Sequence, residues 1–172
     1  MRSRFSRKRF LIVSALFLLL SGLFAIVQGQ QKATAKTKTA VTELSQIPPP
    51  GKADLVSPED LVKILQANGP KPLILSVGPR MLYMQAHIVG AELIGPASEP
   101  SGIDALKQRV KALPKTQPIV IYCGCCPWSH CPNVEPAYKQ LRALGFTNVK
   151  VLFIPNNFGV DWVYKGYPTV RG

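Results

Sequence analysis

Acidic residues are scarce in this sequence, which has nine Asp and Glu against 21 Lys and Arg and a formal net charge of +12 at pH 7. Paired carboxylates and a Gly-rich phosphate loop are absent, so neither a carboxylate-pair active site nor a phosphate-binding loop is predicted. Basic residues interleaved with aromatic ones are also absent, which argues against nucleic-acid binding. The 172 residues, 47% of them hydrophobic, exclude wholesale disorder and are the length of one domain with additional segments.

The first 29 residues have the pattern of an export signal. Five basic residues lie within the first nine, and 18 uncharged residues, FLIVSALFLLLSGLFAIV, follow at positions 10–27. A basic segment, an apolar segment and the small residue Gly29 are typical of a signal peptide, and the apolar segment is also about long enough to span a membrane. We expect residues 1–29 to be a signal peptide or an N-terminal membrane anchor. The rest of the chain is then exported to the cell envelope or periplasm, either anchored to the membrane or secreted.

A polar segment, residues 30–56, separates this signal from the remainder. It is rich in Lys, Thr, Gln and Ala, contains a Pro run at positions 48–50, and shows no sustained apolar periodicity. Such a composition cannot bury enough apolar surface to fold. We therefore predict a disordered linker over residues 30–56 and a folded domain over residues 57–172.

Strand and helix patterns alternate along the predicted domain. Buried strands are expected at residues 72–77, 92–94, 118–122 and 149–154, and helices at residues 58–67, 81–85, 103–113, 134–144 and 161–165. This alternation predicts an α/β fold with a mainly parallel central sheet flanked by helices. The uncharged strand at 118–122 is expected to be covered on both faces. A site is expected where the strands end, at their carboxyl edge.

All four cysteines lie within nine residues that directly follow this strand. The segment reads CGCCPWSHC from Cys123 to Cys131. Asn133 is expected to cap the helix that begins at Val134, so the loop should curl over a helix N-terminus, where peptide N–H groups and the helix dipole stabilise an anion. A thiol there should have a lowered pKa, which favours a nucleophilic Cys123.

Two other interpretations of the cysteine loop remain open. Exported proteins commonly contain structural disulfides, although every loop closed here would be very short and would gain little stability. Alternatively, thiolates and an imidazole suit zinc or copper(I), with the donor set Cys123, Cys125, Cys126, His130 and Cys131.

From Ser57 to the C-terminus the sequence resembles the rhodanese-like domains, a family of sulfurtransferases. The resemblance rests on five segments in the family's order: Leu73–Val77, His87–Ala91, Ile119–Cys123, Leu144–Val149, and Asp161–Trp162 with Gly166–Pro168. These are similar to the first core strand, the His-Ile-Pro-Gly-Ala signature, the strand that ends in the catalytic cysteine, the segment after the active-site helix, and the closing Trp and Gly-Tyr-Pro motif.

The resemblance implies a thiosulfate-type sulfurtransferase without a cofactor. Cys123 would take sulfur from a small donor as a persulfide and pass it to a thiol or to cyanide. The surrounding loop would bind the substrate through Gly124, Cys125, Cys126, Trp128, Ser129 and His130, and its backbone N–H groups would cradle the persulfide. Cys125, Cys126 or Cys131 would accept the sulfur or resolve the persulfide as a disulfide. The rival hypothesis is a non-enzymatic metal-binding or redox-sensing domain on the same fold.

The sequence departs from the family at two places. Ser76-Val77-Gly78 stands where the family has Asp-Val-Arg, and no Arg lies between Cys123 and the following helix. A site for thiosulfate would therefore lack the cationic side chain that the family uses to bind it.

Several other residues receive structural or surface assignments. We expect His87 to be a structural hydrogen-bonding residue at a turn, and Trp162 and Tyr167 to pack in the core and near the C-terminus. Trp128 is expected to shield the site or to pack within the loop. The remaining basic residues of the helices are expected to be solvated: Lys107, Arg109, Lys111, Lys139 and Arg142.

Overall fold

A parallel sheet of five strands lies at the centre of the domain in the computed structural model, which describes residues 44–172. The strand order is β1-β6-β5-β2-β4, and every neighbouring pair is parallel. The predicted mainly parallel sheet is therefore confirmed. The strands are β1 (Leu55–Val56), β2 (Leu73–Ser76), β4 (Ala91–Leu93), β5 (Ile119–Tyr122) and β6 (Val149–Leu152).

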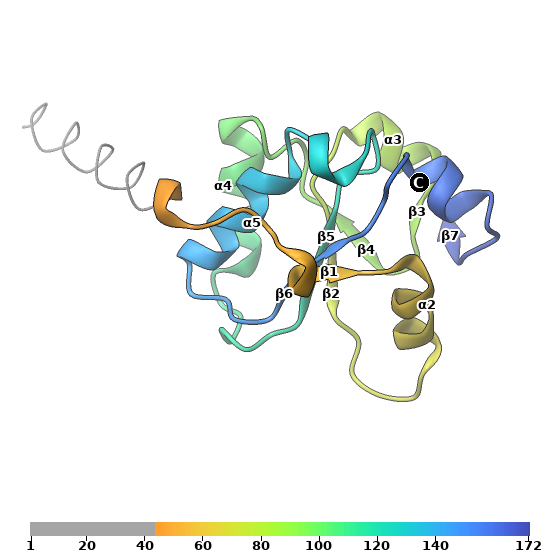
Figure 1. Ribbon diagram of the computed structural model, residues 1–172, viewed down its shortest axis with the longest axis horizontal. Coiled ribbons are helices and arrows are strands. Elements are labelled where there is room, and N and C mark those ends of the chain that lie inside the picture. The colour runs from red at the N-terminus through yellow and green to blue at the C-terminus, as the bar shows by residue number, and fades with distance from the viewer. Residues whose placement is uncertain (1–43) are drawn as a thin grey trace, which may run out of the picture. The chain divides into compact units, whose positions relative to one another are not determined.

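Two layers of helix cover the sheet (Figure 1). On one side α4 (Pro100–Val110) and α5 (Val134–Ala143) pack on one apolar cluster of the sheet, and on the other side lie α2 (Pro58–Gln66) and the π-helical turn η3 (Gly159–Val163). All four residues of β5 are buried, alternating between the two apolar clusters. The expectation that this strand is covered on both faces is confirmed.

A smaller antiparallel pair closes the C-terminal end of the domain. Its strands are β3 (His87–Ile88) and β7 (Thr169–Val170), with α3 (Arg80–Gln85) directly before β3. Trp162 is fully buried beside this pair, and its indole N–H donates to the carbonyl of Pro168 at 3.1 Å. Tyr167 packs edge-on against Trp162, with ring centroids 5.3 Å apart. Both aromatic residues therefore pack as predicted.

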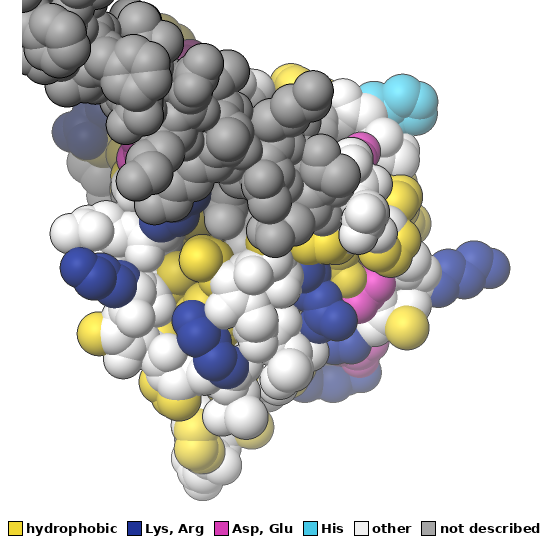
Figure 2. Space-filling view, turned by 90° about the vertical axis from the view of Figure 1, so that its left-hand side faces the viewer, with side chains coloured by type: hydrophobic (Ala, Val, Ile, Leu, Met, Phe, Trp, Pro, Cys, Tyr) yellow, Lys and Arg dark blue, Asp and Glu magenta, His cyan; other side chains and the backbone are white. Residues whose placement is uncertain are grey.

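Most basic residues of α4 and α5 lie on the outer surface of these helices, but Arg109 is half-buried and forms a bidentate ion pair with Glu92, so the expectation that it is solvated is wrong. Lys107 pairs with Asp104 at 3.2 Å, and Lys139 pairs with Glu135 at 2.7 Å. Figure 2 shows this side of the molecule, where Lys and Arg side chains are separated by apolar and polar ones. The described part of this face thus carries dispersed charge.

The predicted linker boundary at residue 56 needs a correction. Leu55 and Val56 form β1, which pairs with Val151 and Leu152 of β6 and is preceded by the short 3-10 helix η1 (Lys52–Asp54). Two apolar residues are too short a run to stand out in a polar segment, and only the neighbouring strand β6 makes them a strand.

The predicted signal peptide or anchor at residues 1–29, and residues 30–43 of the predicted linker, lie outside the described residues. Within residues 44–172, no helix combines the length and apolar character that crossing a bilayer requires.

Candidate active site

The cysteine loop begins where the central strand ends. Cys123 directly follows β5, and Gly124 then adopts a φ of +87°, a backbone conformation that strongly favours glycine. The carbonyl of Gly124 accepts a hydrogen bond from the Phe158 N–H at 3.1 Å, and a Cβ atom on Gly124 would lie 3.0 Å from that of Phe158. The chain therefore turns sharply at Gly124, which leaves Cys123 at the carboxyl edge of the sheet.

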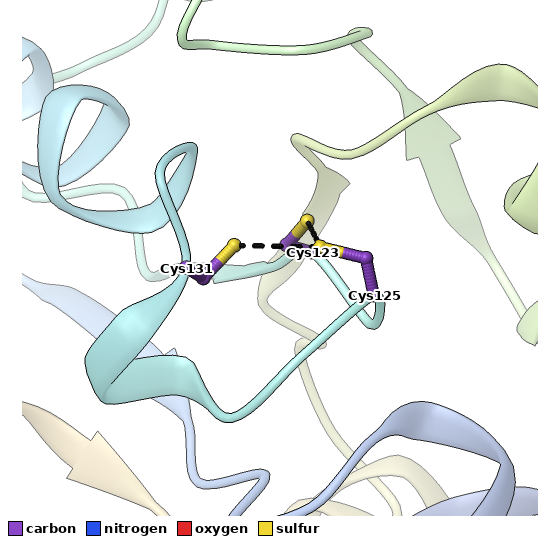
Figure 3. A group of neighbouring side chains, drawn as sticks. All are labelled: Cys123, Cys125 and Cys131. Carbon is purple, nitrogen blue, oxygen red and sulfur yellow. Dashed lines mark hydrogen bonds between the residues drawn. The ribbon is translucent and has the colours of Figure 1, made fainter.

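Three of the four sulfur atoms converge in this loop. The Sγ atoms of Cys123, Cys125 and Cys131 all lie within 4.8 Å of one another, and Figure 3 shows them pointing toward a common centre. Cys125 Sγ lies 3.1 Å from Cys123 Sγ and 3.9 Å from Cys131 Sγ. All four cysteines are free thiols in the structure. The predicted substrate loop is therefore, at its centre, a cluster of thiols.

The other two predicted metal donors differ in their relation to this cluster. Cys126 Sγ lies 3.1 Å from Cys125 Sγ and so borders the cluster, although it is not within 4.8 Å of all three sulfur atoms. His130 is exposed, and its Nδ1 lies 3.0 Å from the hydroxyl of the equally exposed Ser129. Of the five predicted donors, three therefore converge mutually, Cys126 lies beside them, and the short helix η2 (Trp128–His130) places the imidazole against Ser129.

The helix N-terminus stabilises Cys131 rather than Cys123. A hydrogen bond from the Cys123 thiol, together with the backbone N–H groups of Asn133 and Val134, lowers the pKa of Cys131 to about 5. Donation to Cys131 and burial raise the pKa of Cys123 well above its usual range. The predicted lowered pKa of Cys123 is therefore wrong. The loop is long enough to place Cys131, rather than Cys123, over the first N–H groups of α5.

Asn133 also has a different role from the predicted helix cap. Its side chain makes no capping hydrogen bond to α5. Instead its Nδ2 donates to Cys123 Sγ at 3.4 Å, and its Oδ1 accepts the N–H of Ser98 at 2.9 Å. Because Asn133 is only 4% exposed, this amide is a fixed donor beside the sulfur. No local pattern predicts this role, since Ser98 lies 35 residues away.

A cavity of about 350 Å³ opens in front of Cys123. Among the described residues that line it, none carries a charge, and its polar side chains include Ser76 and Tyr122 at the ends of β2 and β5. Sequence reasoning missed the rest of this wall because its residues come from α3 and from the segment around η3, both distant in sequence: Leu82, Tyr83, Gln85, Asn157, Phe158 and Tyr164.

The predicted loop residues divide between this cavity and the opposite side of the loop. Cys123, Gly124 and Cys125 line the cavity, whereas Cys131 does not. Cys126 and Trp128 instead border a small enclosed space next to Cys131.

Backbone groups of the loop are also used differently from the predicted cradle. The Trp128 N–H donates to the carbonyl of Ile154 at 2.9 Å, and the His130 N–H donates to that of Pro127 at 3.0 Å. Within Gly124–Ser129, the Cys125 N–H acts on the Cys123 sulfur and lowers its pKa, against the larger raising effects of Cys131 and burial. Of the predicted cradle, the Cys125 N–H therefore acts on the Cys123 sulfur, whereas the Trp128 N–H bonds to Ile154.

Gly78 approaches the cysteine more closely than any side chain would allow. A Cβ atom at this position would lie 2.6 Å from the carbonyl oxygen and 2.8 Å from the Sγ of Cys123. Such distances are well below van der Waals contact. The Arg that the resembled family has at this position would therefore not fit here without displacing Cys123.

His87 is a structural residue, as predicted. It is buried in β3, its Nδ1 lies 2.9 Å from the carbonyl oxygen of Tyr83, and its ring stacks on that of Tyr83 with centroids 3.7 Å apart. Its place in a short strand differs from the expected turn, and it is not part of the cavity wall.

These features define an α/β domain with a thiol site at the carboxyl end of its central strand. The chain belongs to the rhodanese-like domain family, whose family model matches residues 57–153. Both the fold class and the resemblance noted from the sequence motifs are confirmed by this match.

Solved structures show the same fold. The solution structure of the rhodanese-like domain from the Anabaena sp. Alr3790 protein is 24% identical, with a TM-score of 0.51 over 69% of this chain and 80% of that one. The BH2092 protein from Bacillus halodurans is 20% identical, with a TM-score of 0.53 over 70% of this chain and 79% of that one. No curated protein matches the sequence significantly.

Proposed function

We propose that this protein is a sulfurtransferase that carries sulfane sulfur as a persulfide on Cys123. The observation that carries the proposal is the position of Cys123, which lines the 350 Å³ cavity while a second, more acidic thiol lies within 4.8 Å of it. Cys131 shares one proton with Cys123 across their hydrogen bond but does not line the cavity, so it suits the role of proton acceptor rather than nucleophile.

The reaction follows from this division of roles. The Cys123 thiol passes its proton to the Cys131 thiolate, and the resulting Cys123 thiolate attacks the outer sulfur of a donor R–S–SH. The donor S–S bond breaks, RS⁻ leaves and takes the proton from Cys131, and the persulfide remains on Cys123. An acceptor thiolate or cyanide then attacks the outer sulfur, and Cys123 leaves as a thiolate. Asn133 Nδ2, 3.4 Å from Cys123 Sγ, stabilises that sulfur whenever it is charged.

The uncharged cavity wall favours an organic hydropersulfide as donor over thiosulfate. Thiosulfate carries two negative charges, and burying them without a cation is costly. The wall offers the Ser76 and Tyr122 hydroxyls and apolar contacts from Leu82 and Phe158. Such a wall suits a donor with less charge than thiosulfate.

Loading and release of sulfur test the proposal. Reduced full-length protein is incubated with an organic hydropersulfide or with thiosulfate, and intact mass is measured before and after cyanide treatment. We expect one added sulfur atom, more from the hydropersulfide, and its release as thiocyanate. Cys123→Ser should abolish loading, whereas Cys126→Ser should retain it. Equal loading of the Cys123→Ser variant would contradict the proposal.

We also propose that the domain acts outside the cytoplasm, in the cell envelope. The support is the basic segment followed by 18 uncharged residues at positions 10–27. The intact mass of the protein recovered from its native host distinguishes a cleaved signal from a retained anchor. Recovery of the full-length chain from the cytoplasmic fraction would contradict the proposal.

A further inference from the structure

The three convergent thiols form a donor set that is purely sulfur. Cys123, Cys125 and Cys131 come together within 4.8 Å, and no carboxylate or imidazole from the described residues belongs to the group. Cys123 and Cys131 are 5% and 6% exposed, while Cys125 is exposed. The cluster, whose three side chains Figure 3 shows, is therefore buried at Cys123 and Cys131 and open to solvent at Cys125.

We propose that Cys123, Cys125 and Cys131 bind one Cu(I) ion through three thiolates. Soft thiolate ligands select Cu(I) and zinc among the common metals. Structural zinc sites almost always need four ligands, whereas only three sulfur atoms here lie within 4.8 Å of one another; Cys126 borders the group through its 3.1 Å contact with Cys125, and the imidazole of His130 faces Ser129. A set of three sulfur atoms thus favours the monovalent ion.

The spacing of the sulfur atoms suits a metal at their centre. A metal–sulfur bond of about 2.3 Å places three ligands of a trigonal site about 4 Å apart. The Cys125–Cys131 separation of 3.9 Å already matches, and Cys123 lies 3.1 Å from Cys125, so that pair must open slightly. Because Cys125 is exposed at the tip of the loop, its side chain is free to make this adjustment.

Binding releases protons and builds negative charge that the surroundings can carry. Each sulfur binds the ion as a thiolate, so every ligand that still carries its proton gives it to solvent, with no change in oxidation state. Asn133 Nδ2 donates to Cys123 Sγ, and Trp128, Leu152 and Ile154 wall the closed side of the loop. Cys123 would carry the persulfide under the proposed function, so copper binding and sulfur loading exclude each other.

A competition titration tests the site. Full-length protein, reduced and kept anaerobic, is titrated with Cu(I) against a chromogenic Cu(I) chelator. We expect one ion per chain. Cys125→Ser should weaken binding by at least about a hundredfold, because losing a ligand costs no less than losing a second-shell contact. His130→Ala is the matched control and should leave the affinity within about threefold, as for an ordinary surface substitution, because the exposed imidazole contacts Ser129 and not the three sulfur atoms.

Cys125→Ser is the main test because Cys125 is exposed, so this substitution disturbs the fold less than one at buried Cys123 or Cys131. Cys123→Ser and Cys131→Ser, checked by circular dichroism, should weaken binding as Cys125→Ser does. X-ray absorption of the copper-loaded protein should show a three-sulfur shell. Equal loss in Cys126→Ser or His130→Ala, or more than one ion per chain, would overturn the three-thiolate site. Tighter binding of Zn(II) that depends on Cys126 would overturn it too.

Discussion

Cys131 receives the N–H groups at the start of α5, and Cys123 donates its proton toward it. Two thiols with opposite pKa shifts then share one proton, and the pair has a single anionic charge near neutral pH. A lone thiol in the position of Cys123 would have no partner with which to share its proton. Burial would then raise its pKa and keep it protonated at neutral pH.

Thiolate absorbance should reveal this charge. With its pKa lowered to about 5, Cys131 is deprotonated above that pH and protonated below it. We expect ultraviolet thiolate absorbance in reduced protein to persist as the pH falls from neutrality and to disappear near pH 5. Cys131→Ser should remove this step, whereas Cys126→Ser should not, because burial raises the pKa of Cys126 to about 12. An unchanged titration in Cys131→Ser would contradict the assignment.

Gly78→Ala should disturb the site directly. The added methyl group would lie 2.8 Å from Cys123 Sγ and 2.6 Å from its carbonyl oxygen, so the strand end must shift. We expect slower loading of sulfur onto Cys123. We also expect the free energy of unfolding to fall by about 1–3 kcal/mol, as for other overpacked positions. Thiocyanate release and urea unfolding measure the two effects.

Gly51→Ala serves as the matched control for this substitution. Its added methyl group would meet nothing closer than Asp54 at 3.8 Å, which is ordinary contact. Equal stability and equal sulfur loading of the two variants would show that the close approach at Gly78 has no consequence.

At the scale of elements, the start of α2 depends on one hydroxyl. Ser57 Oγ accepts the N–H of Asp60 at 3.0 Å, and Pro58 occupies the first helical position. Ser57→Ala should lower the free energy of unfolding by about 0.5–2 kcal/mol. Ser101→Ala, near the start of α4, is the control, because its hydroxyl makes only an exposed 3.5 Å contact with Glu99. Urea unfolding that ranks the two variants equally would contradict this role of Ser57.

The longer elements could be predicted from the sequence because each carries its own signal. The β-branched run of β5 and the periodic apolar residues of α5 identify themselves locally. Strands β1, β3 and β7 could not be predicted, since each has two residues and becomes a strand only through a distant partner. The register of β3 with β7, for example, pairs His87 with Val170.

The position of the site could be predicted from the sequence, but which of its thiols carries the negative charge could not. The end of β5 located Cys123, and the family resemblance rests on the same strand. Which thiol meets the N–H groups of α5 depends on the path of the loop, where Gly124 turns the chain and η2 advances it to Cys131. The contacts of Asn133 and Gly78 with Cys123 depend likewise on neighbouring strands and loops rather than on local pattern.

At the scale of the whole molecule, the compact unit spans Gln46–Gly172 and begins before the segment that the family model matches. A chain that starts at residue 57 loses β1, whose Leu55 and Val56 pack against opposite apolar clusters of the sheet. Val56 also provides the carbonyl that accepts the Phe153 N–H at 2.8 Å. The true domain therefore includes part of the segment that its composition predicts to be a linker.

Two truncated chains test this boundary. Starting the chain at residue 57 rather than at residue 46 should cost about 2–4 kcal/mol, the value of two partly buried aliphatic side chains with their strand pairing. Thermal or urea unfolding of the two chains measures the difference. Equal stability would show that β1 contributes nothing to the fold.

The outer strands of the sheet are its shortest, since β1 has two residues and β4 has three. Each rim of the sheet consequently exposes few open amides and carbonyls for a foreign peptide to dock along. Crowded molecules of this domain should for that reason resist fibrous, edge-to-edge polymerisation, even with an interior built from β-branched segments.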